Sequence, residues 1–152
     1  MASTASIPEP VELSISPTLL FRVGESLYGC DIRDTQEIIP LRSMTRLPGA
    51  PAYVRGLINV RGVIVTVLDL ATRLNAVSSR TSEEGSILLV RHRERLVGAM
   101  VDAVSDVRVL EIDADGAPSQ GGGGVVRGVA TVDGAAVVVL DLDALIQQVL
   151  LS

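Results

Sequence analysis

The feature that most constrains the fold of this sequence is an internal repeat. VRGLINVRGVIVTVLDL (residues 54–70) and VRGVATVDGAAVVVLDL (residues 126–142) match at ten of seventeen positions without a gap, at a spacing of 72 residues. Upstream, LLFRVGESLYG (residues 19–29) matches LLVRHRERLVG (residues 88–98) at six of eleven positions, at a spacing of 69 residues. A period this long that occurs only twice predicts a duplicated subdomain rather than a solenoid of many repeats.

The repeated segments have the sequence character of β-strands. VIVTVL in the first copy and AVVVL in the second are β-branched runs of strand length, bounded by glycine. Asp133-Gly134 is a pair that favours a two-residue hairpin turn in which both residues adopt a positive φ, and Arg61-Gly62 occupies the same place in the first copy. We therefore predict an all-β fold with short helices, built as two small barrels packed together.

Composition indicates the class of protein. The chain has 152 residues, of which 47% are hydrophobic and only 2% aromatic, so its core must be built from Val, Leu, Ile and Ala. A net charge of −5 with scattered arginines disfavours binding to nucleic acid or to a membrane surface. No apolar run approaches the roughly 20 residues that span a bilayer, and the N-terminus does not resemble a signal peptide. We expect a cytoplasmic protein that binds no nucleic acid and does not insert into a membrane.

Polar stretches predict the domain boundaries. Residues 1–16 are polar and contain proline, so we expect a disordered N-terminal arm. The folded domain is expected over residues 17–152, as two approximate subdomains, 17–78 and 86–152, separated by SSRTSEEGS. The glycine run within residues 115–124 could be mistaken for a phosphate cradle. No Lys-Ser or Lys-Thr follows it, so a surface loop is the better interpretation.

The sequence offers few residues for catalysis. Asp69 and Asp141 occupy matching places in the two copies, as the paired carboxylates of an aspartic-type hydrolase would. Each is followed by a bulky leucine rather than a small residue, so a capping role is favoured, with Asp141 opening a C-terminal helix. His92, flanked by arginines, is expected on the solvated surface, and Cys30 as a small buried residue outside any disulfide or metal site. We expect a non-catalytic protein without metal or cofactor.

Positions at which the copies differ are candidates for a partner contact. Arg61 stands where the second copy has Asp133, and arginine has no advantage in a hairpin turn, so a salt bridge or a partner contact is a candidate role. Val101, Val104 and Val107 are three residues apart, a spacing that no regular strand buries on one face. It predicts a bulged strand, or an apolar residue exposed to a partner such as a helix.

The same segments resemble a known family. LPGAPAYVRGLINVRGVIVTVLDLATRL is similar to the signature of CheW-like domains, in which a proline-containing turn leads into Gly, two apolar residues, Asn, an apolar residue and Arg-Gly, then an apolar strand and Asp-Leu. YGCDIRDTQEII and LVGAMVDAVSDV resemble the other landmarks of the family, and they stand in the family's order. The resemblance covers roughly residues 18–150. It implies two packed five-stranded SH3-like barrels of the CheW-like fold, with no active site.

The resemblance also implies partners. Stand-alone members are adaptors of bacterial chemotaxis that couple the cytoplasmic tip of a methyl-accepting chemotaxis receptor to the regulatory domain of the CheA histidine kinase. Receptor tips, which are helical hairpins, lie in an apolar groove between the barrels, and barrel ends associate into rings within receptor arrays. For this chain the resemblance therefore implies a location at the inner-membrane receptor array, reached through partners, and self-association in rings as a further contact.

Individual residues are implied by their match to the family motif. The receptor-binding residues implied in this way are Thr35, Glu37, Arg61, Val104 and Val107. The hairpin-shaping residues are Gly56, Asn59 and Gly62. Thr35 stands where the family usually has an apolar residue, a departure that would weaken or retune receptor binding. Three alternatives stay open: a CheW-like scaffold of another chemosensory or motility pathway, a duplicated aspartic-type hydrolase that uses Asp69 and Asp141, and a structural oligomer whose barrels pair only with copies of themselves.

Overall fold

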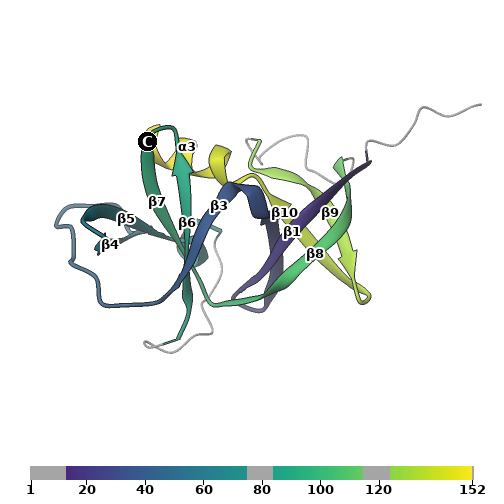
Figure 1. Ribbon diagram of the computed structural model, residues 1–152, viewed down its shortest axis with the longest axis horizontal. Coiled ribbons are helices and arrows are strands. Elements are labelled where there is room, and N and C mark those ends of the chain that lie inside the picture. Colours follow the sequence, from purple (N-terminus) through teal and green to yellow (C-terminus); the bar gives the residue numbers. More distant parts are fainter. Residues whose placement is uncertain (1–12, 75–83, 115–123, 152) are drawn as a thin grey trace, which may run out of the picture.

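The computed structural model describes residues 13–74, 84–114 and 124–151, which form a largely β-structured protein (Figure 1). The first copy of the repeat contains β1 (Leu13–Val23), β2 (Ser26–Asp31), the 3-10 helix η1 (Ile32–Asp34), β3 (Thr35–Pro40), β4 (Val54–Val60), β5 (Val63–Asp69) and α2 (Leu70–Arg73). The second copy contains β6 (Ser86–His92), β7 (Arg95–Val101), β8 (Ala103–Asp113), β9 (Val126–Val132), β10 (Ala135–Leu140) and α3 (Leu142–Leu151).

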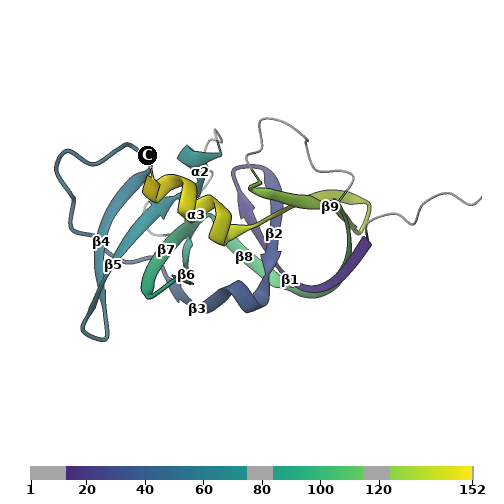
Figure 2. The ribbon, with the colours of Figure 1, turned by 90° about the horizontal axis from the view of Figure 1, so that it is seen from above.

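Each sheet combines strands from both copies of the repeat. The first sheet is a closed barrel with the strand order β1-β2-β10-β9-β8, and the second has the order β3-β6-β7-β5-β4. The opening hairpin of each copy therefore joins the closing hairpin of the other copy, through the parallel pairs β2–β10 and β7–β5. The sheets lie beside each other, with the closed barrel at one end and β4–β5 at the other (Figures 1 and 2).

The predicted all-β class with a C-terminal helix is confirmed, and the two predicted five-stranded barrels correspond to two packed five-stranded sheets. The division into subdomains 17–78 and 86–152 does not match the sheets, because backbone pairing exchanges hairpins between the two ranges. Among the described strands, hydrogen bonding closes the first sheet. The ladder of the second sheet ends at β3 and β4, although an isolated bridge between Thr45 and Leu57 adds the intervening segment to the edge of β4.

The N-terminal boundary also differs from the prediction. The strand β1 begins at Leu13, and its first residues pair with the far end of β8, from Leu13 opposite Asp113 to Ser16 opposite Leu110. The last residues of the predicted arm are therefore part of the barrel. The strand β8 is long enough to provide hydrogen-bonding partners for their backbone groups. Residues 1–12, most of the SSRTSEEGS separator and the glycine run before Gly124 lie outside the described residues.

Three apolar clusters stabilise the fold. One lies inside the closed barrel, and one is formed by side chains of the second sheet. The third lies between the sheets and combines side chains of β1, β2, β6 and β7 with those of α2 and α3, among them Phe21, Leu88 and Ile146. These three side chains are completely buried, so this part of the seam is a packed core, and a partner of the seam would have to bind at its margins.

The predicted turns and caps are confirmed. Arg61 and Gly62 have φ values of 49° and 87°, and Asp133 and Gly134 have 50° and 82°, so both turns have two residues in the left-handed region. The Asp69 carboxylate accepts a hydrogen bond from the Ala71 amide at 3.0 Å at the start of α2. Asp141 likewise accepts from the amide of Ala144, at 3.0 Å, at the start of α3. The two carboxylates are therefore engaged at separate helix starts.

The expectation for His92 was wrong. Its side chain is only 7% exposed, and Nδ1 lies 2.6 Å from Oδ1 of Asp143 in the first turn of α3. The flanking arginines suggested solvent, but α3 covers this end of β6 and carries the aspartate that pairs with the imidazole. Cys30, by contrast, is fully buried, as predicted.

Candidate functional site

Two of the residues implied as receptor-binding form one ion pair on the second sheet. Arg61, in the turn between β4 and β5, donates from Nη1 to Oε2 of Glu37 on β3 at 3.2 Å, and from Nη2 to Oε1. Hydrogen bonding from Arg61 lowers the pKa of Glu37, and the same bond raises the pKa of Arg61. The Arg61 side chain is 67% exposed and the Glu37 side chain 36%, so the pair presents a fixed array of charges on the surface and adds little to the stability of the fold.

The turn that carries Arg61 is shaped by its neighbours. Oδ1 of Asn59 accepts a hydrogen bond from the Gly62 amide at 2.9 Å, which closes the turn from within. This bond supports the turn of the first copy, where Arg61 must adopt a positive φ that a non-glycine residue rarely takes. The geometry therefore directs the guanidinium toward β3, where it meets Glu37.

The closed barrel contains a related pair with the charges reversed. Asp133, which matches Arg61 in the repeat, lies in the turn between β9 and β10, and its Oδ2 accepts from Nη1 of Arg108 on β8 at 3.3 Å. The arginine is on the turn in one sheet and on the strand in the other. Since the backbones of the two turns are alike, this reversal of charge distinguishes the two ends of the molecule for a charged partner.

A bulge in β8 explains the spacing of the valines. Val104 is opposite Phe21 and Val107 is opposite Leu19, so three residue steps along β8 match two along β1. The extra residue brings Val104 and Val107 to the same face of the strand, as the spacing predicted. Val104 packs against the seam core, and Val107 remains 49% exposed at its margin.

The second sheet repeats this bulge on β3. Thr35 is opposite Val90 and Ile38 is opposite Leu88, so these two β3 residues also share a face. At the repeat spacing of 69, Thr35 matches Val104 and Ile38 matches Val107. Ile38 is 40% exposed, and it is a candidate site residue that the sequence reasoning missed. The repeat could have revealed this residue, because the spacing of 69 residues that matches Thr35 with Val104 also matches Ile38 with Val107.

The implied residues thus fall into two groups on different sheets. Thr35, Glu37 and Arg61 belong to the second sheet, while Val104 and Val107 belong to the closed barrel. Thr35 lies at the seam, with its hydroxyl 3.7 Å from the Cys30 sulfur of the closed barrel. The two groups therefore flank the seam core, and the structure describes direct bonding only within the Glu37–Arg61 pair.

Gly56 has a structural role at a distance from the hairpin turn. A Cβ at this position would lie 2.6 Å from the carbonyl oxygen of Thr45, because the segment after β3 crosses β4 there. Gly128, its match in the second copy, is crowded in the same way: a Cβ would lie 2.5 Å from the carbonyl oxygen of Asp113. Both glycines are thus needed where the backbone of a neighbouring segment comes close: the segment after β3 at Gly56, and the end of β8 at Gly128.

A buried carboxylate fixes η1, the element that leads into β3. The side chain of Asp31 accepts from the Arg33 amide at 2.9 Å, from Arg33 Nε at 2.8 Å and from the Ser16 hydroxyl at 3.1 Å. Arg127 of β9 approaches it to 3.8 Å. The hydrogen bonds from Arg33 hold the pKa of Asp31 well below its ordinary value, so this carboxylate remains charged and links η1 to β1.

The described residues offer no recognisable centre for catalysis or metal binding. No three His, Cys, Asp or Glu side chains among them come close enough to hold a metal ion. Burial raises the pKa of the Cys30 thiol to about 12, which disfavours the nucleophilic thiolate. No helix in the described part of the chain has the length and apolar character to cross a membrane. What this surface offers is an exposed ion pair and apolar side chains along a seam.

Comparison with known proteins identifies a family. Residues 17–150 match the model of the CheW-like domain. Similar curated proteins include a chemotaxis protein CheW of Rhizobium meliloti, 32% identical over 83% of this chain and 84% of the relative, and one of Thermotoga maritima, 29% identical over 86% and 87%. The scaffolding protein TtCheW of Thermoanaerobacter tengcongensis has a similar crystal structure, with a TM-score of 0.74 and 30% identity over 87% of this chain and 92% of that one.

Proposed function

Because this chain belongs to the CheW-like domain family, we propose that it is an adaptor that couples a chemotaxis receptor to the CheA histidine kinase. The relatives reported above are named as chemotaxis proteins and, for the solved structure, as a scaffolding protein, and this chain is not an enzyme. The observation that carries the proposal is the family match over residues 17–150 together with the shared three-dimensional fold. In this function the protein acts by binding and by geometry, in the cytoplasm at the receptor array.

The surface at the seam supports a receptor contact. A helical receptor tip would meet Val107 and Ile38, both apolar and exposed, at margins of the two sheets. The Glu37–Arg61 pair on the second sheet would add a charged contact that fixes the orientation of the helices. A contact to both sheets would let a rearrangement of the receptor change how the adaptor holds the kinase.

Titration calorimetry tests the kinase contact first. The purified protein is titrated with the regulatory domain of the CheA kinase from the same organism. Saturable one-to-one binding supports the adaptor function. If the protein is folded but neither the titration nor analytical ultracentrifugation detects a complex with the kinase domain, the proposal is contradicted. A large species formed without any partner would instead favour the structural oligomer.

The receptor contact is tested by Arg61→Asp against a cytoplasmic fragment of the receptor. Aspartate is suitable because Asp133 occupies the matching turn with a φ of 50°, so the variant can keep the turn conformation. It replaces the ion pair with two like charges, and we expect receptor binding to weaken at least about tenfold while kinase binding is kept. Asp133→Arg, the inverse change in the matching turn, is the control. Equal loss in both variants would contradict the assignment of the second sheet to the receptor.

A further inference from the structure

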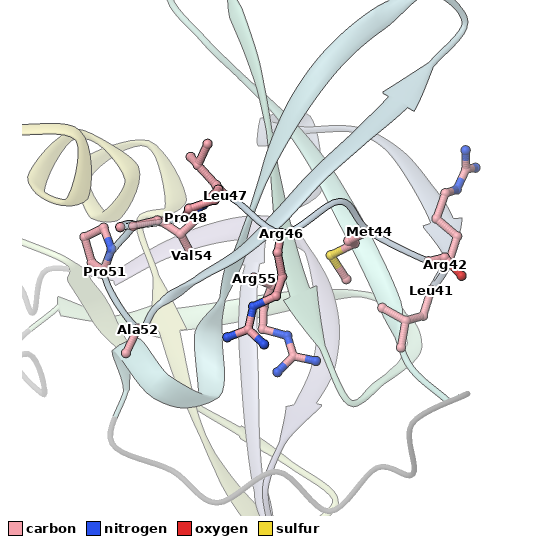
Figure 3. A pocket seen from close by; sticks show the side chains of 13 residues that line it. Leu41, Arg42, Met44, Arg46, Leu47, Pro48, Pro51, Ala52, Val54 and Arg55 are labelled. Atoms are coloured by element: carbon pink, nitrogen blue, oxygen red, sulfur yellow. The ribbon is translucent and has the colours of Figure 1, made fainter.

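A hollow on the second sheet holds two arginines that have no acidic partner. The segment between β3 and β4, with the start of β4, lines a hollow of about 670 Å³. Arg46 and Arg55 both extend into it (Figure 3). Neither guanidinium forms a hydrogen bond or an ion pair with the described part of the chain, and among the described residues none that lines the hollow is Asp or Glu.

Backbone pairing holds the two arginines close together. Thr45 and Leu57 exchange both backbone hydrogen bonds, at 2.9 and 2.8 Å, so the segment before β4 lies against that strand. Arg46 follows Thr45, and Arg55 stands two residues before Leu57, so the bridge brings them to neighbouring positions across the pair. The close approach at Gly56 described above maintains this arrangement.

Two neighbouring guanidinium groups without an acid form a site for an anion. Each arginine offers a planar fork of donors that matches a carboxylate, and the two positive charges lower the free energy of an anion placed between them. Arg42, a third arginine on the rim, donates to the carbonyl oxygen of Asn59 at 3.3 Å and points away from the other two (Figure 3). The hollow is basic although the chain as a whole carries a net charge of −5, so it is a local feature of the surface.

The wall of the hollow indicates the kind of anion. Leu47, which is 45% exposed, and Pro48 also line the hollow. A small inorganic anion would use the guanidinium groups alone and leave this apolar surface in water. A peptide segment with an acidic residue next to an apolar one would use both. We propose that the hollow binds an acidic segment of a partner protein, with a carboxylate on Arg46 and Arg55 and an apolar side chain against Leu47 and Pro48.

This surface is separate from the candidate receptor contact. Arg55 lies near the start of β4, whereas Arg61 follows the end of that strand. The proposal does not depend on the function proposed above, because it follows from the charges and the shape of the hollow. It adds an electrostatic docking point at the end of the molecule opposite the closed barrel (Figure 2).

The test uses the full-length protein labelled with ¹⁵N and a blocked peptide, Gly-Leu-Asp-Glu-Leu-Asp-Gly. We expect saturable shifts of amide signals in residues 44–55. A matched peptide with Asn and Gln in place of the acids should bind at least about tenfold more weakly, as should the acidic peptide to the double variant Arg46→Gln, Arg55→Gln. Arg95→Gln removes another exposed arginine that lies outside the hollow, and should leave the affinity unchanged.

Three results would overturn the proposal. Equal binding of the neutral peptide would show that the carboxylates are not recognised, and unchanged affinity in the double variant would show that the arginines are not the site. Inorganic phosphate that shifts the same signals with a higher affinity than the peptide would assign the hollow to a free anion. Because both arginines are exposed, loss of folding in the double variant is not expected, and its far-ultraviolet circular dichroism checks this.

Discussion

Exchange of hairpins between the copies predicts that the two sheets unfold as one unit. Ile146 on α3 is completely buried in the cluster that joins the sheets, so Ile146→Ala leaves a cavity in the part of the core that both share. Truncation of a fully buried isoleucine costs about 3 kcal/mol of unfolding free energy. For a chain of this length that corresponds to a drop of about 10 °C in Tm. The loss should be the same whichever sheet is observed.

The chain contains natural probes for each sheet. It has two tyrosines and no tryptophan: Tyr28 lies on β2 of the closed barrel, and Tyr53 lies just before β4 of the second sheet. Both tyrosines pack against the seam core, so in Tyr53→Phe the fluorescence reports on the barrel side of that core, and in Tyr28→Phe it reports on the side of the second sheet. Urea unfolding of each, with and without Ile146→Ala, should give a single transition that coincides with the loss of circular dichroism, with both probes showing the same decrease in free energy.

The control is the same substitution at an isoleucine on the surface. Ile64 on β5 is 60% exposed, and Ile64→Ala should cost less than about 1 kcal/mol. If the two tyrosines report different midpoints, or if Ile146→Ala destabilises one sheet alone, then the sheets are independent units and the reasoning from the shared core is refuted.

Three further predictions follow from single contacts. Arg33 holds the pKa of Asp31 below its ordinary value, so the stability this carboxylate adds is complete above about pH 4 and is lost as the pH falls further; Asp31→Asn should flatten the dependence of the unfolding free energy on pH in that acid range. Gly128→Ala sets a Cβ 2.5 Å from the Asp113 carbonyl and should cost about 3 kcal/mol in urea unfolding, against about 1 kcal/mol for Gly134→Ala, where the turn is open. Cys30, with its pKa raised to about 12, should react with a thiol reagent at pH 8 only at the rate of unfolding.

The elements themselves could be predicted from the sequence. Strands, turns and caps depend on residues close together in the chain: β-branched runs, Asp133-Gly134 at a tight turn, and Asp141 before an apolar helix. The bulge of β8 was also predictable, because the spacing of Val104 and Val107 is inconsistent with a regular strand. The family resemblance rests on the same local patterns, and the family match confirmed it.

Contacts between distant segments required the tertiary structure. The burial of His92 depends on α3, whose Asp143 lies 51 residues further along the chain. Arg61 was recognised as a candidate for a salt bridge, but its contact with Glu37 became visible only when β3 and the β4–β5 turn were placed. The hollow with Arg46 and Arg55 likewise depends on the bridge between Thr45 and Leu57, which no local pattern announces.

The repeat shows most clearly what the sequence determined and what it left to the tertiary structure. By itself it determined that the same set of strands and turns forms twice, because alternation and turn residues act over a few positions. It did not determine which hairpin pairs with which. Strands pair through backbone N–H and C=O groups, which are the same in every residue except proline, so the matching edges of two related hairpins are nearly equivalent partners. Only the packing of the seam core, which needs β1, β2, β6 and β7 together with both helices, selects the exchanged arrangement.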